Sequence, residues 1–118
     1  MQKRLTFTET PEGRTLFVTL WDGITYGASD GKPKDRDRRG AIAKVQRILV
    51  AVSEPIPGPD PSRPVNARQL KGGEQTVLLY GAQVALINEL LNLVAWGGAS
   101  LLDVAALDDA LGALPDAE

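Results

Sequence analysis

The stretch KDRDRRGAIAKVQRILVAV, residues 34–52, decides the fold because it carries the clearest helical pattern in the sequence. Its apolar residues recur at spacings of three and four and would form one stripe along a helix: Ile42, Val45, Ile48, Leu49 and Val52. Asp35 and Asp37 stand at the amino end, where the helix dipole favours negative charge. The sequence therefore predicts a helix that begins at Lys34 or Asp35 and ends at Val52.

A run of cations lies in this stretch and in the loop before it. Seven basic residues and two acidic ones fall within sixteen residues, which gives a local net charge of +5. A basic loop that leads into a helix can contact phosphates in a nucleic-acid groove. Asp35 and Asp37 would oppose such contact, and a solvated face or a dock for an acidic part of the chain are the alternatives. The candidate contact residues are Lys32, Lys34, Arg36, Arg38, Arg39, Lys44 and Arg47.

Charge is divided unevenly along the chain. The protein has 118 residues, with 13 basic and 15 acidic side chains and a formal net charge of −2. All 13 basic residues lie in residues 1–71 together with eight acids, so that part carries +5. Residues 72–118 have seven acids and no base, and carry −7. We expect either two differently charged faces or two parts that attract each other.

The residues that are missing exclude several kinds of chemistry. The chain has no cysteine and no histidine, so it offers no disulfide, thiol nucleophile, imidazole base or ordinary zinc site. The carboxylates that could act in pairs are Asp103, Asp108 and Asp109, or Asp35 and Asp37. Helix electrostatics or a solvated face explains each of them. We therefore predict no enzymatic activity, no metal and no cofactor.

Residues 5–20 alternate between apolar and polar side chains on either side of a turn signal. Leu5 and Phe7 alternate with threonines, Pro11-Glu12-Gly13 supplies a turn, and Leu16, Val18 and Leu20 alternate again. A period of two on both sides of a turn is typical of an antiparallel β-hairpin. The sequence therefore predicts an N-terminal hairpin.

Residues 20–29 have two interpretations. Asp22-Gly23 between apolar residues is typical of a tight hairpin turn, which would make the next residues a third strand. Thr19 and Asp22 instead have the spacing of a capping box, which would start a short helix. In that helix Gly23 and Gly27 would each cost about 1 kcal/mol relative to alanine. The residues themselves leave both readings open.

Five prolines lie between residues 54 and 66, and they predict a connector within one domain that spans residues 1–118. Neither a helix nor a central strand persists through such a segment, and polyproline II is its expected local form. Residues 61–64 read Pro-Ser-Arg-Pro and match the loose PxxP pattern of SH3 ligands. A proline-rich connector produces that match by chance, so we give it no function.

A short strand and an apolar helix follow the connector. Gln75 to Leu79 has the composition of a strand, which could join the N-terminal hairpin in one sheet. Residues 82–96 predict a helix with two adjacent apolar stripes, ended by Gly97-Gly98 as a C-terminal cap. So broad an apolar surface belongs in the centre of a core or at an interface between copies of the chain.

A last helix is predicted after residue 100. Ser100 and Asp103 have the spacing of a capping box, and Pro115 would stop the helix. The elements together predict an α+β fold in which a small antiparallel sheet, made of the N-terminal hairpin and the later strand, packs against three to four helices.

Trp21 and Trp96 are the candidate interface anchors. Each follows an apolar segment and precedes a glycine within two residues. A tryptophan in that position either folds back to seal the edge of a core or anchors a partner protein.

The order of these pieces resembles small accessory proteins encoded by tailed phages and prophages. The resemblance rests on the opening Leu5-Thr6-Phe7 strand, the charged stretch leading into residues 38–49, and Val77-Leu78-Leu79 followed by a helix closing on Trp96. It implies that residues 20–29 form a helix and that the protein acts by binding a host or virion protein.

We therefore expect a cytoplasmic, non-catalytic protein that binds a protein partner and does not enter a membrane. Its longest uncharged run is too short to span a bilayer. The helix predicted at residues 82–96 could also join two copies of the chain. The alternative function is nucleic-acid binding through the basic residues between Lys32 and Arg47.

Overall fold

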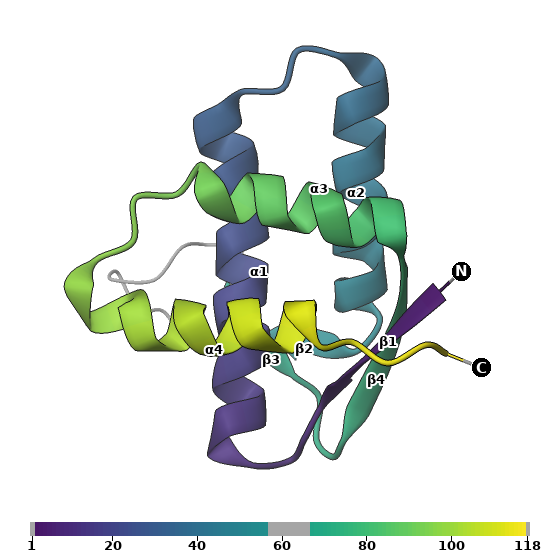
Figure 1. Ribbon diagram of the computed structural model, residues 1–118, viewed down its shortest axis with the longest axis vertical. Coiled ribbons are helices and arrows are strands. Elements are labelled where there is room, and N and C mark those ends of the chain that lie inside the picture. Colours follow the sequence, from purple (N-terminus) through teal and green to yellow (C-terminus); the bar gives the residue numbers. More distant parts are fainter. Residues whose placement is uncertain (1, 57–66, 118) are drawn as a thin grey trace.

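The computed structural model describes residues 2–56 and 67–117. It contains two small sheets and a set of helices that pack against one side of the larger sheet (Figure 1). The elements, in chain order, are β1 (Gln2–Phe7), α1 (Pro11–Gly31), α2 (Arg36–Val50), β2 (Ser53–Pro55), β3 (Arg68–Leu70), β4 (Gln75–Tyr80), α3 (Gly81–Asn92), a 3-10 turn η1 (Gly98–Ser100) and α4 (Leu101–Gly112). The predicted α+β fold with a small antiparallel sheet is confirmed.

The larger sheet pairs β1, at the start of the chain, with β4. β1 lies antiparallel to β4, with Gln2 opposite Tyr80 and Phe7 opposite Gln75. Residues 115–117 lie along the other edge of β1, where the Arg4 N–H donates to the Pro115 carbonyl over 2.9 Å. The second sheet is a short antiparallel pair, in which Ser53 of β2 lies opposite Leu70 of β3.

Residues 11–20 form a helix, so the predicted N-terminal hairpin is wrong. Thr10 caps α1, because its hydroxyl accepts a hydrogen bond from the Gly13 N–H at 3.2 Å. Pro11 is the first helical residue, where its fixed φ suits a helix and its missing N–H costs nothing. Leu16, Val18 and Leu20 fit a period of two, but the buried residues of α1 follow the helical spacing.

The same helix continues to Gly31, so residues 20–29 are helical as one interpretation predicted, and the third strand is wrong. The capping box predicted at Thr19 and Asp22 is also wrong, because both residues lie inside a helix that begins at Pro11. Its buried face includes Phe17, Leu20 and Ile24, which are fully buried. Phe17 meets Phe7 of β1 edge to face, with ring centroids 5.4 Å apart. This contact joins the helix to the sheet in one core.

Two glycines allow α3 to cross close to α1. A Cβ at Gly27 would collide with the backbone carbonyl of Leu90, and one at Gly23 would collide with the side chain of Leu91. The sequence shows these glycines only as a cost to helix stability. Their use is steric, because no larger residue would let the two helices approach so closely.

The helix predicted at residues 34–52 is confirmed as α2, Arg36–Val50. Asp35 caps it, with Oδ1 accepting from the Asp37 N–H over 2.8 Å. Ile42, Val45 and Leu49 are buried as the stripe predicts. The strand predicted from Gln75 is confirmed as β4. Residues 57–66 of the predicted connector, including the PxxP match, lie outside the described residues.

α3 is shorter than the helix predicted at residues 82–96. It ends at Asn92, so Gly97-Gly98 is not its cap. The chain leaves the helix early and returns, and the Trp96 indole N–H donates to the Leu91 carbonyl over 3.1 Å. Leu86, Ile87, Leu90 and Leu91 are buried in the chain's own core. The core interpretation of this helix is therefore confirmed.

The last helix is confirmed as α4, but the predicted capping box is wrong. Ser100 precedes the helix and makes no side-chain capping bond. It belongs to η1 and has helical backbone angles, so its hydroxyl is not placed as a cap requires. The helix ends at Gly112, three residues before Pro115. In the described residues, no helix is long and apolar enough to cross a membrane.

We predict opposite effects for alanine at Gly27 and at Gly40. Gly27→Ala should lower the free energy of unfolding by about 1–3 kcal/mol, because the new methyl group collides with Leu90. Gly40→Ala should raise it by up to about 1 kcal/mol, because Gly40 lies within α2 with no heavy atom near its missing Cβ. Urea unfolding curves measure both. Equal effects at the two positions would contradict the close helix crossing.

Candidate binding surfaces

The predicted basic residues lie on the α1–α2 connection and on α2. Lys32 follows α1 in a left-handed conformation, with φ 43°, and Lys34 lies in the connection. Both are exposed, as are Arg36, Arg39, Lys44 and Arg47, whereas Arg38 is half-buried. The connection stands out from the rest of the molecule at the end away from the sheet (Figure 1).

Three of these cations lie on the same side of α2. Arg36, Lys44 and Arg47 fall within about one quarter of the helix circumference and opposite the buried Ile42–Val45–Leu49 stripe. Along the axis they span about 16 Å. We call them the α2 basic row. A row of exposed cations at this spacing can follow successive phosphates.

Arg38 faces the other way, toward α3. Its Nη1 lies 2.6 Å from Oε2 of Glu89, and the two side chains are 37% and 61% exposed. A second ion pair joins Lys3 to Asp116 at 2.6 Å. Both pairs connect a base of residues 1–71 with an acid of residues 72–118. The oppositely charged parts of the chain are therefore partly neutralised by each other.

The two candidate anchors have different environments. Trp21 is 5% exposed and belongs to the core, with the Arg68 guanidinium carbon 5.9 Å from its ring centroid. Trp96 is half-buried and lies against Gly23, where a Cβ would come within 3.2 Å of the indole ring. Trp96 lines a cleft that is open to solvent.

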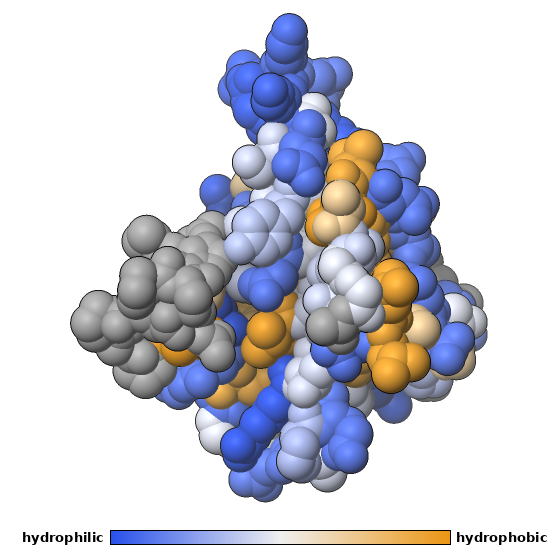
Figure 2. Space-filling model, turned by 90° about the vertical axis from the view of Figure 1, so that its left-hand side faces the viewer, coloured by the Kyte–Doolittle hydropathy of each residue, from blue (hydrophilic) through white to orange (hydrophobic). Residues whose placement is uncertain are grey.

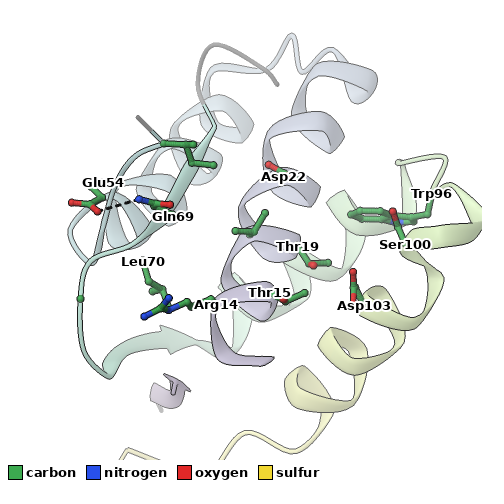
Figure 3. A pocket seen from close by; sticks show the side chains of 13 residues that line it. Arg14, Thr15, Thr19, Asp22, Glu54, Gln69, Leu70, Trp96, Ser100 and Asp103 are labelled. Carbon is green, nitrogen blue, oxygen red and sulfur yellow. Dashed lines mark hydrogen bonds between the residues drawn. The ribbon is translucent and has the colours of Figure 1, made fainter. Parts of the chain in front are cut away.

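That cleft lies over the outward face of α1 (Figure 3). Its volume is about 540 Å³. Residues of α1 form its floor, the β2–β3 hairpin forms one wall, and Trp96 and the start of α4 form the other. The residues that line it are Arg14, Thr15, Val18, Thr19, Asp22, Glu54, Ile56, Gln69, Leu70, Gly72, Trp96, Ser100 and Asp103.

Two smaller hollows extend the cleft along α1. One, of about 310 Å³, shares Thr15 and Asp103 with it, and the other, of about 360 Å³, shares Asp22, Trp96 and Ser100. Together the three hollows line α1 from Pro11 to Asp30, a distance of about 28 Å along the helix axis. Figure 2 shows this face, with apolar side chains exposed beside it. We call the three together the α1 groove.

Carboxylates outnumber cations in the lining of the α1 groove. In the part of the chain that the structure describes, Glu12, Asp22, Asp30, Glu54 and Asp103 line it, against Arg14 alone. None of its lining residues belongs to α2, so the groove and the α2 basic row occupy different surfaces. No group of three acidic side chains among residues 2–56 and 67–117 is placed to hold a metal ion. Apolar groups, including Trp96 and Leu16, alternate with the charged ones.

Sequence reasoning missed the α1 groove because it treated residues 11–20 as a turn and a strand. Thr15, Asp22 and Tyr26 recur at spacings of seven and four, which places them on one face of a helix. That signal was present in the sequence. The two walls come from segments far apart along the chain, and no local pattern indicates them.

Comparisons with protein-family models, with curated proteins and with solved structures found no match to this chain.

We predict that the Arg38–Glu89 pair contributes little to stability. Arg38→Ala should lower the free energy of unfolding by less than about 1 kcal/mol, because both side chains are partly exposed to water. The loss should shrink in high salt, which screens exposed charges. A double-mutant cycle with Glu89→Ala, followed by urea unfolding at two salt concentrations, isolates the pair, and Arg39→Ala is the control. A coupling that salt leaves unchanged would contradict this prediction.

Proposed function

We propose that the protein is a non-catalytic binding domain whose α1 groove holds a segment of another protein. The observation that carries this proposal is the open groove of about 28 Å on one face of a helix. An extended chain covers about 3.3 Å per residue, so the groove has room for a segment of about eight residues. Apolar side chains in the groove supply contact area, and the polar ones fix the orientation of the bound segment.

The charge of the lining supports a basic partner. Glu12, Asp30 and Asp103 are exposed at the groove, and among the described residues Arg14 is the one cation that lines it. Lysine or arginine side chains of a partner would face these carboxylates, and charges of this kind speed association and exclude acidic partners. Trp96 lies at the middle of the groove, where an aromatic anchor contributes most to binding.

The chemistry of the lining supports binding rather than catalysis. The chain has no thiol and no imidazole, and the groove carboxylates come from three separate elements, α1, β2 and α4. From the resemblance to phage accessory proteins, we propose that the partner is a host or virion protein.

We predict that filling the groove removes binding. Thr15 lines both the main cleft and the smaller hollow beside it, so Thr15→Trp should weaken partner binding at least about tenfold. Ser29→Trp is the matched control, because Ser29 is exposed on the same helix but lines none of the hollows. The measurement compares proteins that the immobilised wild type and both variants retain from the source cell.

Two variants that each remove one charge of α4 distinguish the groove from the rest of this helix. Asp103→Asn should weaken the same binding and reduce its dependence on salt, because Asp103 lines the groove. Asp108→Asn removes an exposed charge of the same helix that lies outside it. A partner that Thr15→Trp and Asp103→Asn retain as well as the wild type would refute the groove as its site.

The α2 basic row favours nucleic-acid binding as a second candidate function. Its three cations are exposed and aligned, which suits a phosphate backbone. The sequence places Asp35 among the cations, where it would repel a phosphate. In the structure its carboxylate caps α2 by accepting from the Asp37 N–H, which weakens this repulsion. Arg39 adds a further exposed cation, although its Nη1 donates to the Lys34 carbonyl over 2.9 Å.

For this second function we predict retention on a duplex-DNA column that falls steeply as salt rises. Arg36→Ala with Arg47→Ala should reduce the slope of log affinity against log salt by about two, since each phosphate contact contributes about 0.9. Arg4→Ala with Arg14→Ala removes two exposed cations elsewhere and serves as the control. Retention that is the same for both double variants, or absent for the wild type, would rule out the α2 basic row as a nucleic-acid site.

A further inference from the structure

The free edge of β4 offers backbone hydrogen-bonding groups without partners. On β1, the Arg4 N–H and the Gln2 carbonyl bond to residues 115–117, so the even-numbered residues of β1 point their backbone groups away from β4. Successive residues of a strand point to opposite edges. Lys3, Leu5 and Phe7 therefore bond to Leu79, Val77 and Gln75, which lie opposite them.

It follows that Thr76, Leu78 and Tyr80 point their backbone groups to the outer edge of β4. The Tyr80 N–H on this edge donates to Oε1 of Gln83 over 2.8 Å. In the described part of the chain, no backbone or side-chain group bonds to the outward N–H and C=O of Thr76 and Leu78. Both residues are exposed, so these four groups can accept another strand.

β4 also lacks the features that keep edge strands apart. Its sequence QTVLLY contains no charged residue and no proline, whereas edge strands are usually protected by one of these or by a bulge. Leu78 and Tyr80 on its outer face are 42% and 55% exposed.

We propose that β4 pairs antiparallel with β4 of a second copy of this chain across a two-fold axis at Val77. In this register Thr76 lies opposite Leu78 of the partner subunit, and the reverse, so all four free backbone groups form hydrogen bonds. The result is a four-stranded sheet in the order β1–β4–β4–β1.

The two-fold register fits the side chains as well. Glu74, the acid next to the strand, falls opposite Tyr80 of the partner subunit, so the pairing brings no like charges together. The two Leu78 side chains become diagonal neighbours on the outer face and cover each other from water. A symmetric pair of identical edges is the usual basis of a two-fold dimer. α3, which buries Leu86, Ile87, Leu90 and Leu91 in the core of its own chain, contributes none of these contacts.

The first experiment measures mass against concentration by sedimentation equilibrium. We expect the wild type to pass from 12.6 kDa to twice that mass. Thr76→Pro removes one outward N–H per chain, and two per dimer, so the dissociation constant should rise about tenfold. Thr76→Ala is the matched control, because it loses the same hydroxyl contact with Thr6 but keeps the N–H. It should dimerise like the wild type.

The second experiment tests the register and does not depend on proline. The chain has no cysteine, so a Thr76→Cys chain and a Leu78→Cys chain each carry one thiol. Opposed residues lie within reach of a disulfide, whereas two copies of position 76 lie farther apart. Mild oxidation of the mixture should form the mixed dimer faster than either homodimer. A wild type that stays monomeric at every concentration, a dimer that Thr76→Pro does not weaken, or equal rates of all three crosslinks would overturn the proposal.

Discussion

The close crossing of α3 over α1 is the contact on which the other surfaces depend. Gly23 and Gly27 leave no Cβ between the helices, so the backbone of Leu90 lies directly on α1. Because α3 is held there, the chain that follows it returns along the same side of α1, and Trp96 rests on Gly23. The second wall of the α1 groove is therefore a consequence of two small residues on the side of α1 that meets α3, and a bulkier α1 would have displaced that wall.

The sequence predicted the elements whose apolar pattern fits a single secondary-structure period. It missed the first half of α1, whose pattern fits both the strand and the helix period. α2 has an unbroken stripe at spacings of three and four, and it was found almost to its ends. Residues 16–20 satisfy a strand and a helix equally well over so short a window. Pro11 fits a turn, but a proline that follows a capping threonine also fits the first position of a helix. Thr10, which caps α1, decides between a helix and a strand, and it lies outside the alternating residues 16–20.

The candidate sites were harder to predict than the elements because they are made by distant segments. The predicted basic residues lie at the surface, but periodicity did not show that Arg38 turns toward Glu89, 51 residues away. The α1 groove needs α1, the β2–β3 hairpin and the start of α4 together. The free edge of β4 needs the pairing with β1 and the bridge from residues 115–117. None of these pairings leaves a local signal.

The uneven charge of the chain is only partly cancelled by folding. Lys3–Asp116 and Arg38–Glu89 each join a base of the first part to an acid of the second. The cations of the α2 basic row and the groove carboxylates take no part in these two pairs, and they lie on different elements. β4 presents an edge with no charge at all. Charge steers an oppositely charged partner to a surface. The α2 basic row therefore suits a negatively charged molecule, and the acidic α1 groove suits a positively charged one. The uncharged edge, which neither attracts nor repels by charge, suits an identical chain.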